Sequence, residues 1–131
     1  MLRNLSLASV MVLAMAAPAL ADASACYEPI APAAVDGNTA TEAQLMASQS
    51  DVKDFLKSSD DYQTCLISDL QEQKRQAARS KDKKPLDPSI EADVNAKIAK
   101  NQKLKEQVGA EFNNAVHAYQ AKHPAPAAPA H

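Results

Sequence analysis

Two long stretches of the chain carry apolar residues at helical spacing. The first holds no Gly or Pro from 40 to about 80, and its apolar residues mostly recur at gaps of three, four and seven. This spacing repeats one face of an α-helix, and a second stretch after Pro88 shows it again. We therefore predict helices over about 39–80 and 88–122. The apolar positions are Leu45, Val52, Phe55, Leu56, Tyr62, Leu66 and Leu70 in the first helix, and Ile90, Val94, Ile98, Leu104, Val108, Phe112, Val116 and Tyr119 in the second.

Capping signals mark the ends of these predicted helices. Thr39 and Glu42 fit a capping box, in which the threonine caps the first turn and the glutamate reaches back to it. Asp87 before Pro88 predicts the start of the second helix, because aspartate is a good cap and proline suits the first helical position. Pro124 predicts that this helix ends just upstream, since the residue before a proline avoids helical backbone angles.

A short polar connection makes the two helices antiparallel neighbours. The predicted fold class is all-α: a long, coiled-coil-like antiparallel two-helix hairpin over 39–122. Asn101 falls within the second apolar stripe, where it would set the helix register or, after a slight rotation, face solvent. Both interpretations stay open at this point. Folding about residue 84 predicts these opposed pairs: Leu66 with the Asn101 region, Phe55 with Phe112, and Val52 with Val116.

The N-terminus has the three parts of a signal peptide. Arg3 supplies a positive charge, an apolar run follows over 5–17, and Ala19-Leu20-Ala21 matches the small-x-small cleavage pattern. The run is shorter than the ~20 apolar residues of a membrane-spanning helix. We expect residues 1–21 to be removed near Ala21, with sites after Ala23 or Ala25 as alternatives, which predicts a periplasmic or secreted protein.

Export leaves two cysteines, Cys26 and Cys65. An even count in an oxidising compartment favours one disulfide, which would close a loop of about 40 residues and contribute about 4 kcal/mol. The alternatives are unpaired cysteines, a bridge between chains, or lipid attachment at Cys26. The last is less favoured, because Ala23 stands where a lipobox usually has leucine and Asp22 precedes it.

Residues 22–38 are predicted to form an extended strap. If a helix begins at Thr39, Cys65 lies about 39 Å along its axis at 1.5 Å per residue. The chain from Cys26 to Thr39 spans about 40 Å as polyproline II, a form that Pro29 and Pro32 favour. An Asp36-Gly37 turn reverses the chain between the strap and the first helix. The strap must therefore lie nearly taut along that helix. The apolar side chains expected to dock against that helix are Tyr27, Ile30 and Val35.

Composition narrows the functional classes. Hydrophobic residues make up 46% of the chain but aromatic residues only 4%, which is too few for a broad core or a deep pocket. Two glycines leave no Gly-rich phosphate loop. No nucleophile and base stand in a known catalytic spacing, so we expect neither an enzyme nor a cofactor.

All histidines lie in the last fifteen residues, and their spacing does not place two on one helical face, so no metal ligands are assigned. The Pro/Ala-rich residues 123–131 are predicted to be a disordered tail. The histidines are His117, His123 and His131.

A basic cluster surrounds the predicted connection, with Asp82 as its single acid. Such a cluster would meet an anionic membrane surface or an acidic partner, or else be a solvated loop. No aromatic residue interleaves it, so nucleic-acid stacking is not expected. The cluster comprises Lys74, Arg75, Arg79, Lys81, Lys83 and Lys84.

The stretches 26–29 (CYEP), 35–41 (VDGNTAT) and 62–66 (YQTCL) resemble small exported proteobacterial proteins of unknown function. Those proteins share an N-terminal Cys/Pro strap, an aspartate–glycine turn and a Tyr-x-x-Cys helix. The resemblance covers about 26–70 and implies no activity.

We predict a non-catalytic exported envelope protein that acts as a helical protein-interaction or structural module, with a protein partner in the cell envelope. A homodimer through a leftover apolar stripe would form a four-helix bundle. The alternative is an envelope module that binds metal ions or an anionic membrane surface.

Overall fold

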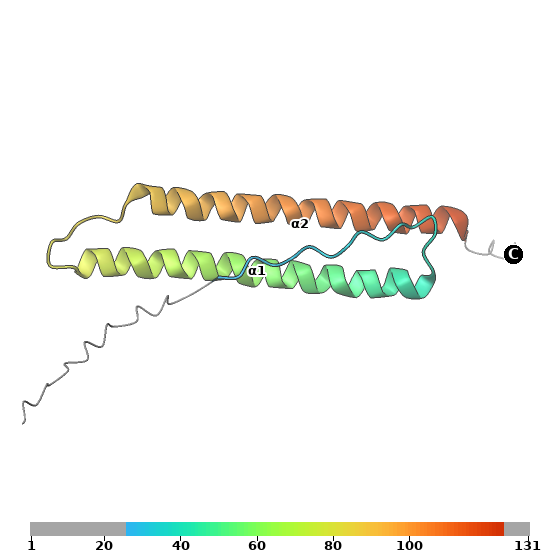
Figure 1. The fold of residues 1–131 in the computed structure, drawn as a ribbon, viewed down its shortest axis with the longest axis horizontal. Coiled ribbons are helices and arrows are strands. Elements are labelled where there is room, and N and C mark those ends of the chain that lie inside the picture. The colour runs from blue at the N-terminus through green and yellow to red at the C-terminus, as the bar shows by residue number, and fades with distance from the viewer. Residues whose placement is uncertain (1–25, 125–131) are drawn as a thin grey trace, which may run out of the picture.

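The computed structural model describes residues 26–124; the predicted signal peptide, strap residues 22–25 and most of the predicted tail lie outside this range. Two long helices, α1 (Glu42–Arg79) and α2 (Pro88–Lys122), pack antiparallel into a thin rod (Figure 1). Between 26 and 124 the chain has no strand. The all-α hairpin is therefore confirmed, and α2 has the predicted bounds behind its N-cap, Asp87.

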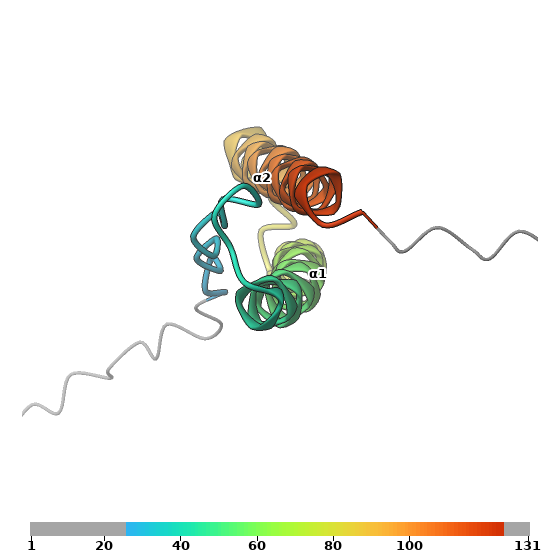
Figure 2. The same ribbon diagram turned by 90° about the vertical axis from the view of Figure 1, so that its right-hand side faces the viewer.

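An extended strap, 26–35, lies beside the two helices and runs antiparallel to α1 (Figure 1). Seen along the rod, it forms the third corner of a triangle with α1 and α2 (Figure 2). Cys26 and Cys65 are joined by a disulfide, with 5.8 Å between their Cα atoms. The bridge and the path of the strap agree with the length argument from the sequence.

Helix α1 begins three residues later than predicted, because Thr39 belongs to the turn and does not cap the helix. The backbone N–H of Thr39 donates to the carbonyl of Asp36 at 3.1 Å, and its hydroxyl is 3.2 Å from the Asp36 carboxylate. Thr41 is the true N-cap. Its hydroxyl accepts from the Gln44 backbone N–H at 3.2 Å, while the Gln44 side chain accepts from the Thr41 backbone N–H at 2.8 Å. The predicted capping box with Glu42 is therefore wrong by two residues.

Two apolar clusters form the core between the helices, in place of one continuous stripe. Partly buried residues of the strap and α2 pack against both clusters, joined by Leu86 of the tip at one and by Leu56 of α1 at the other. The cluster nearer the tip consists of Tyr62, Leu66, Leu70 and Val94, and the cluster nearer the strap turn consists of Val52, Phe55 and Val108.

A buried polar layer separates the clusters. Asn101 and Ser59 are both 0% exposed. The Asn101 amide nitrogen donates to the Ser59 hydroxyl at 3.2 Å, and its carbonyl oxygen accepts from the Gln63 amide at 2.8 Å. Asn101 therefore faces the partner helix, as the register interpretation requires, and not solvent.

The observed register differs from the predicted one by one to two helical turns. Asn101 lies against Ser59 and Gln63, whereas the prediction placed it near Leu66. Leu66 instead packs in the cluster of Val94. The connection is the physical reason: the tip folds Leu86 back onto this cluster, so the hairpin does not bend symmetrically about residue 84.

Candidate interaction surfaces

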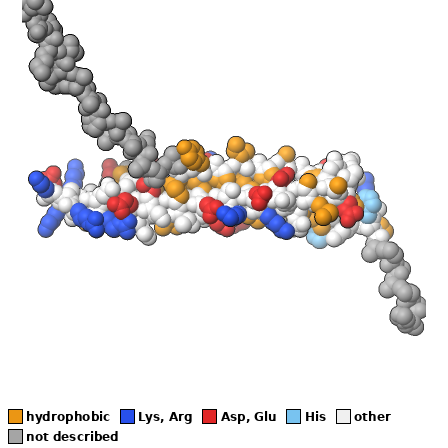
Figure 3. Space-filling model, turned by 90° about the horizontal axis from the view of Figure 1, so that it is seen from below, with side chains coloured by type: hydrophobic (Ala, Val, Ile, Leu, Met, Phe, Trp, Pro, Cys, Tyr) orange, Lys and Arg blue, Asp and Glu red, His pale blue; other side chains and the backbone are white. Residues whose placement is uncertain are grey.

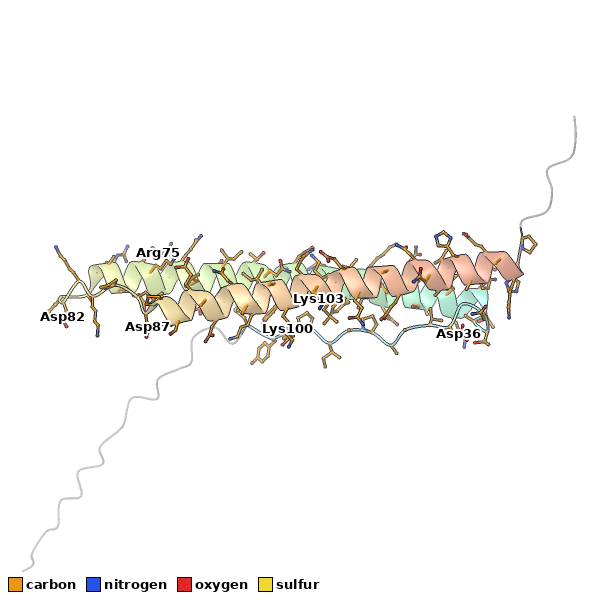
Figure 4. The ribbon with its side chains drawn as sticks, turned by 90° about the horizontal axis from the view of Figure 1, so that it is seen from above. Asp36, Arg75, Asp82, Asp87, Lys100 and Lys103 are labelled. Atoms are coloured by element: carbon orange, nitrogen blue, oxygen red, sulfur yellow. A yellow bond between two sulfur atoms is a disulfide. The ribbon has the colours of Figure 1, made fainter. Side chains whose placement is uncertain are left out.

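The N-terminal end of the strap is fixed by a covalent bond and an ion pair. The disulfide ties Cys26 to α1 at Cys65, and the Glu28 carboxylate lies 2.9 Å from the Lys100 ammonium on α2. The hydrogen bond and the charge of Glu28 raise the pKa of Lys100 above its usual value. Figure 4 shows Lys100 on the side of α2 where the strap lies. The start of the strap is thus attached to both helices, to α1 through Cys26 and to α2 through Glu28.

The other end of the strap is fixed by a close backbone approach. Gly37 is buried, and a Cβ atom placed on it would lie only 1.8 Å from the carbonyl oxygen of Ala115 on α2. Lys122 also donates to the Asn38 carbonyl at 3.0 Å. In the same turn, a hydrogen bond from the Asn38 backbone N–H is the main reason that the pKa of Asp36 is lowered. Only glycine allows the turn this close to α2.

The side chains of the strap follow a period of three. Every third residue from Cys26, namely 26, 29, 32 and 35, is partly buried, whereas 27, 30 and 33 are exposed. Polyproline II has three residues per turn, so these are two faces of one extended strand. Tyr27 is 83% and Ile30 is 93% exposed. The prediction that Tyr27 and Ile30 dock against the helix is therefore wrong, and Val35 alone of the three is partly buried.

An open groove lies between this outward row and α1, and we call it the strap groove. Its first part, about 700 Å³, is lined by 27–33 of the strap and by Asp51, Asp54, Phe55 and Ser58 of α1. A second hollow of about 400 Å³ shares Ala33 and Asp51 with the first and extends it to the turn at 36–40 and to 44–48 of α1. In Figure 3, apolar side chains form a row along this edge of the rod. The sequence prediction missed the groove, although the period-three spacing of Tyr27 and Ile30 carried the signal.

The basic cluster lies at the tip of the hairpin, where the structure divides it in two. Lys74 pairs with Glu91 at 2.8 Å, and Arg75 donates to Glu72 at 3.0 Å and lowers the Glu72 pKa. These two basic residues therefore lie on the helix surfaces with their charges matched. Figure 4 shows Arg75 on α1 and Asp82 at the tip.

The remaining four basic residues are exposed and take part in no ion pair between 26 and 124. Lys83 has φ of 45°, in the left-handed region that non-glycine residues rarely adopt. Figure 3 shows the basic side chains concentrated at this end of the rod. The four residues are Arg79, Lys81, Lys83 and Lys84.

The histidines are not brought together. His117 is exposed on α2, and His123 stacks on Tyr119 with ring centroids 4.2 Å apart. His131 lies outside the described residues. Among residues 26–124, no three His, Cys, Asp or Glu side chains are grouped closely enough to hold a metal ion.

Comparisons with protein-family models, curated proteins and solved structures find no match for this chain. In the described part, neither helix is sufficiently long and apolar to cross a membrane.

Proposed function

We propose that this protein is an exported, non-catalytic interaction module of the cell envelope that uses its strapped hairpin to present a fixed docking surface. One observation carries the proposal. Tyr27 and Ile30, two large apolar side chains, point into solvent from a segment anchored at both ends. Isolated exposed apolar residues are ordinary, but a row beside a groove is typical of a binding surface.

The rigidity of the surface supports this function. The disulfide at Cys26 and the Gly37 contact hold the strap before any partner arrives. A preorganised strand loses little conformational entropy on binding, so more of the contact energy appears as affinity. A partner would therefore meet a ready-made surface rather than a loop that must first be ordered.

Site-specific photo-cross-linking in cells tests the proposal. A photoreactive amino acid replaces Ile30 in one variant and the exposed Gln107 of α2, which lines no part of the groove, in the control. We expect position 30 to give one discrete protein adduct and position 107 to give none. Equal adduct patterns from both positions would contradict a docking surface at the strap.

The export part of the proposal has its own test. Under non-reducing conditions, the intact mass of the mature protein should correspond to a chain that begins at Asp22 and is lighter by two hydrogens, because Cys26 is bridged to Cys65. A retained signal peptide would contradict export. An added diacylglyceryl mass on Cys26 would show instead that the mature protein is a lipoprotein anchored to the membrane.

The unpaired charges of the tip favour a second candidate function, the binding of anionic lipid headgroups. Lys81, Lys83 and Lys84 protrude together without an acidic partner within 26–124. Clustered lysines near an anionic bilayer contribute about 1 kcal/mol each, and salt screens the attraction.

Vesicle sedimentation tests this second function. We expect binding to anionic vesicles but not to neutral ones, and a loss of binding when the three tip lysines become glutamine. The control changes the exposed Lys53, Lys97 and Lys103 to glutamine, which removes the same charge elsewhere. Equal loss in both triple variants would show that net charge, and not the tip, is responsible.

A further inference from the structure

The strap groove has one apolar wall and one acidic wall. The strap supplies the outward row Tyr27, Ile30 and Ala33. Helix α1 supplies Asp51, Asp54 and Ser58 at spacings of three and four, which places them on one side of the helix. Phe55, only 4% exposed, contributes to the floor. The groove therefore has an apolar surface with carboxylates along one edge.

Every charged side chain that lines the groove is acidic. They are Glu28, Asp36, Asp51 and Asp54, and no Lys, Arg or His lines either part. Glu28 is already paired with Lys100, but Asp51 and Asp54 take part in no ion pair between 26 and 124. The complementary ligand has apolar side chains flanked by positive charges.

A second copy of this chain does not supply that ligand. If two strap grooves met face to face across a two-fold axis, Asp51 and Asp54 of one copy would approach the same carboxylates of the other. The basic tip carries the opposite charge, but its apolar residue, Leu86, is packed against its own core. Both of these contacts with a second copy are therefore unfavourable, which favours a different protein as the occupant.

The dimensions of the groove suit a helical segment. Its α1 wall extends from Gln44 to Ser58, which is about 21 Å at 1.5 Å per residue. A helix of about 14 residues has that length and presents its apolar side chains on one face. Helices that lay one apolar face into a groove are a recurring mode of recognition.

We propose that the strap groove binds a cationic amphipathic helix of a partner protein. This inference rests on the proposed function and specifies the chemistry of the partner. Apolar side chains of the partner cover Tyr27 and Ile30, while its Lys or Arg side chains pair with Asp51 and Asp54.

A pair of labelled peptides tests the inference on the disulfide-bonded mature protein. One 14-residue peptide carries leucines on one helical face and lysines elsewhere, and the other has glutamate in place of every lysine. We expect fluorescence anisotropy to show saturable binding of the lysine peptide and at least tenfold weaker binding of the glutamate peptide. No binding of the lysine peptide, or equal binding of both, overturns the inference.

Variants assign the binding to the groove. Asp51→Asn combined with Asp54→Asn should weaken the lysine peptide about three- to tenfold, since exposed ion pairs are individually weak. The matched control, Asp82→Asn with Glu106→Gln, removes the same charge from exposed positions that line neither part of the groove, and it should leave affinity unchanged. Equal weakening by both pairs would mean that only net charge attracts the peptide.

The apolar contact has its own pair of variants. Ile30→Ser should weaken the lysine peptide about tenfold, whereas Ile67→Ser, at an exposed position of α1 outside the groove, should not. All of the changed side chains are exposed, so helicity measured by circular dichroism should be unaltered. Adducts at position 30 in cells without selective binding of the lysine peptide would refute this inference and leave the proposed function standing.

Discussion

Replacing Gly37 with alanine tests how the strap is held against α2. The added Cβ would lie 1.8 Å from the Ala115 carbonyl oxygen and 2.9 Å from its Cα. Both are backbone atoms within a regular helix, about two turns before its end, so they cannot rotate away. The turn must instead retreat by about 1.6 Å, to the 3.4 Å where ordinary van der Waals contact begins. Retreat would expose Ala115, which is now buried, and stretch the contact between Lys122 and the Asn38 carbonyl.

Two opposing contributions set the magnitude. Overpacking of this kind costs about 1–3 kcal/mol. Alanine also restricts the unfolded chain, which returns about 0.4–1 kcal/mol. We therefore expect Gly37→Ala to lower the free energy of unfolding by about 1–2 kcal/mol. For a folded part of this size, each kcal/mol corresponds to a Tm change of about 4–8 °C, so Tm should fall by roughly 5–15 °C.

The chain contains an internal control for this prediction. An alanine Cβ at Gly109 would meet nothing within 4 Å, and Gly109 lies within α2. There the same substitution should stabilise by about 0.5–1 kcal/mol, because alanine is the better helix former. Thermal unfolding followed by circular dichroism should move Tm in opposite directions for the two variants. A Tm for Gly37→Ala at or above that of Gly109→Ala would refute the close approach of the turn to α2.

Three further predictions concern the bridge, the polar layer and the turn. Cys65→Ser should lower the free energy of unfolding by about 4 kcal/mol in urea titrations, and a reductant should destabilise the wild type equally but leave the variant unchanged. Ser59→Ala should cost about 1–3 kcal/mol, because it leaves the buried Asn101 amide without its acceptor, and an equally stable variant would mean that water replaces the hydroxyl. The pKa of Asp36 is lowered from 3.8, so its contribution to stability should be present above about pH 4 and lost as the pH falls through the lowered pKa. Asp36→Ala should therefore show a flatter decline in Tm with acid than the wild type. Parallel curves of Tm against pH would contradict this.

For the strap, the sequence predicted the path of the chain correctly but the direction of its apolar side chains wrongly. Its length and its prolines predicted the path along α1 and the partner of Cys26. Hydrophobicity alone then predicted that Tyr27 and Ile30 face inward, but in a polyproline strand they share a face with each other and not with Cys26. Once the disulfide turns Cys26 inward, the period of three turns both side chains outward. The groove was therefore implicit in the sequence, but only jointly with the bridge.

The position of Asn101 illustrates a different limit. Its place in the apolar stripe predicted a choice between register and solvent, and the structure selects register through its contacts with Ser59 and Gln63. Nothing local to Asn101 indicates those partners, because they lie about forty residues away on the other helix. The turn at Gly37 is similar: the sequence predicted the turn, whereas the need for glycine arises from Ala115.

By itself, the sequence determined the two helices, the cap at Asp87 and the hairpin, and it favoured the bridge between Cys26 and Cys65 that the structure contains. These features depend on periodicity, capping chemistry and chain length, all of which act within one segment or across one connection. Only the tertiary structure decided the helix register, the buried polar layer, the outward row of the strap and the acidic groove beside it. Each of these depends on how side chains from distant segments share space, and the packing of Leu86 and the close approach of Gly37 set that arrangement.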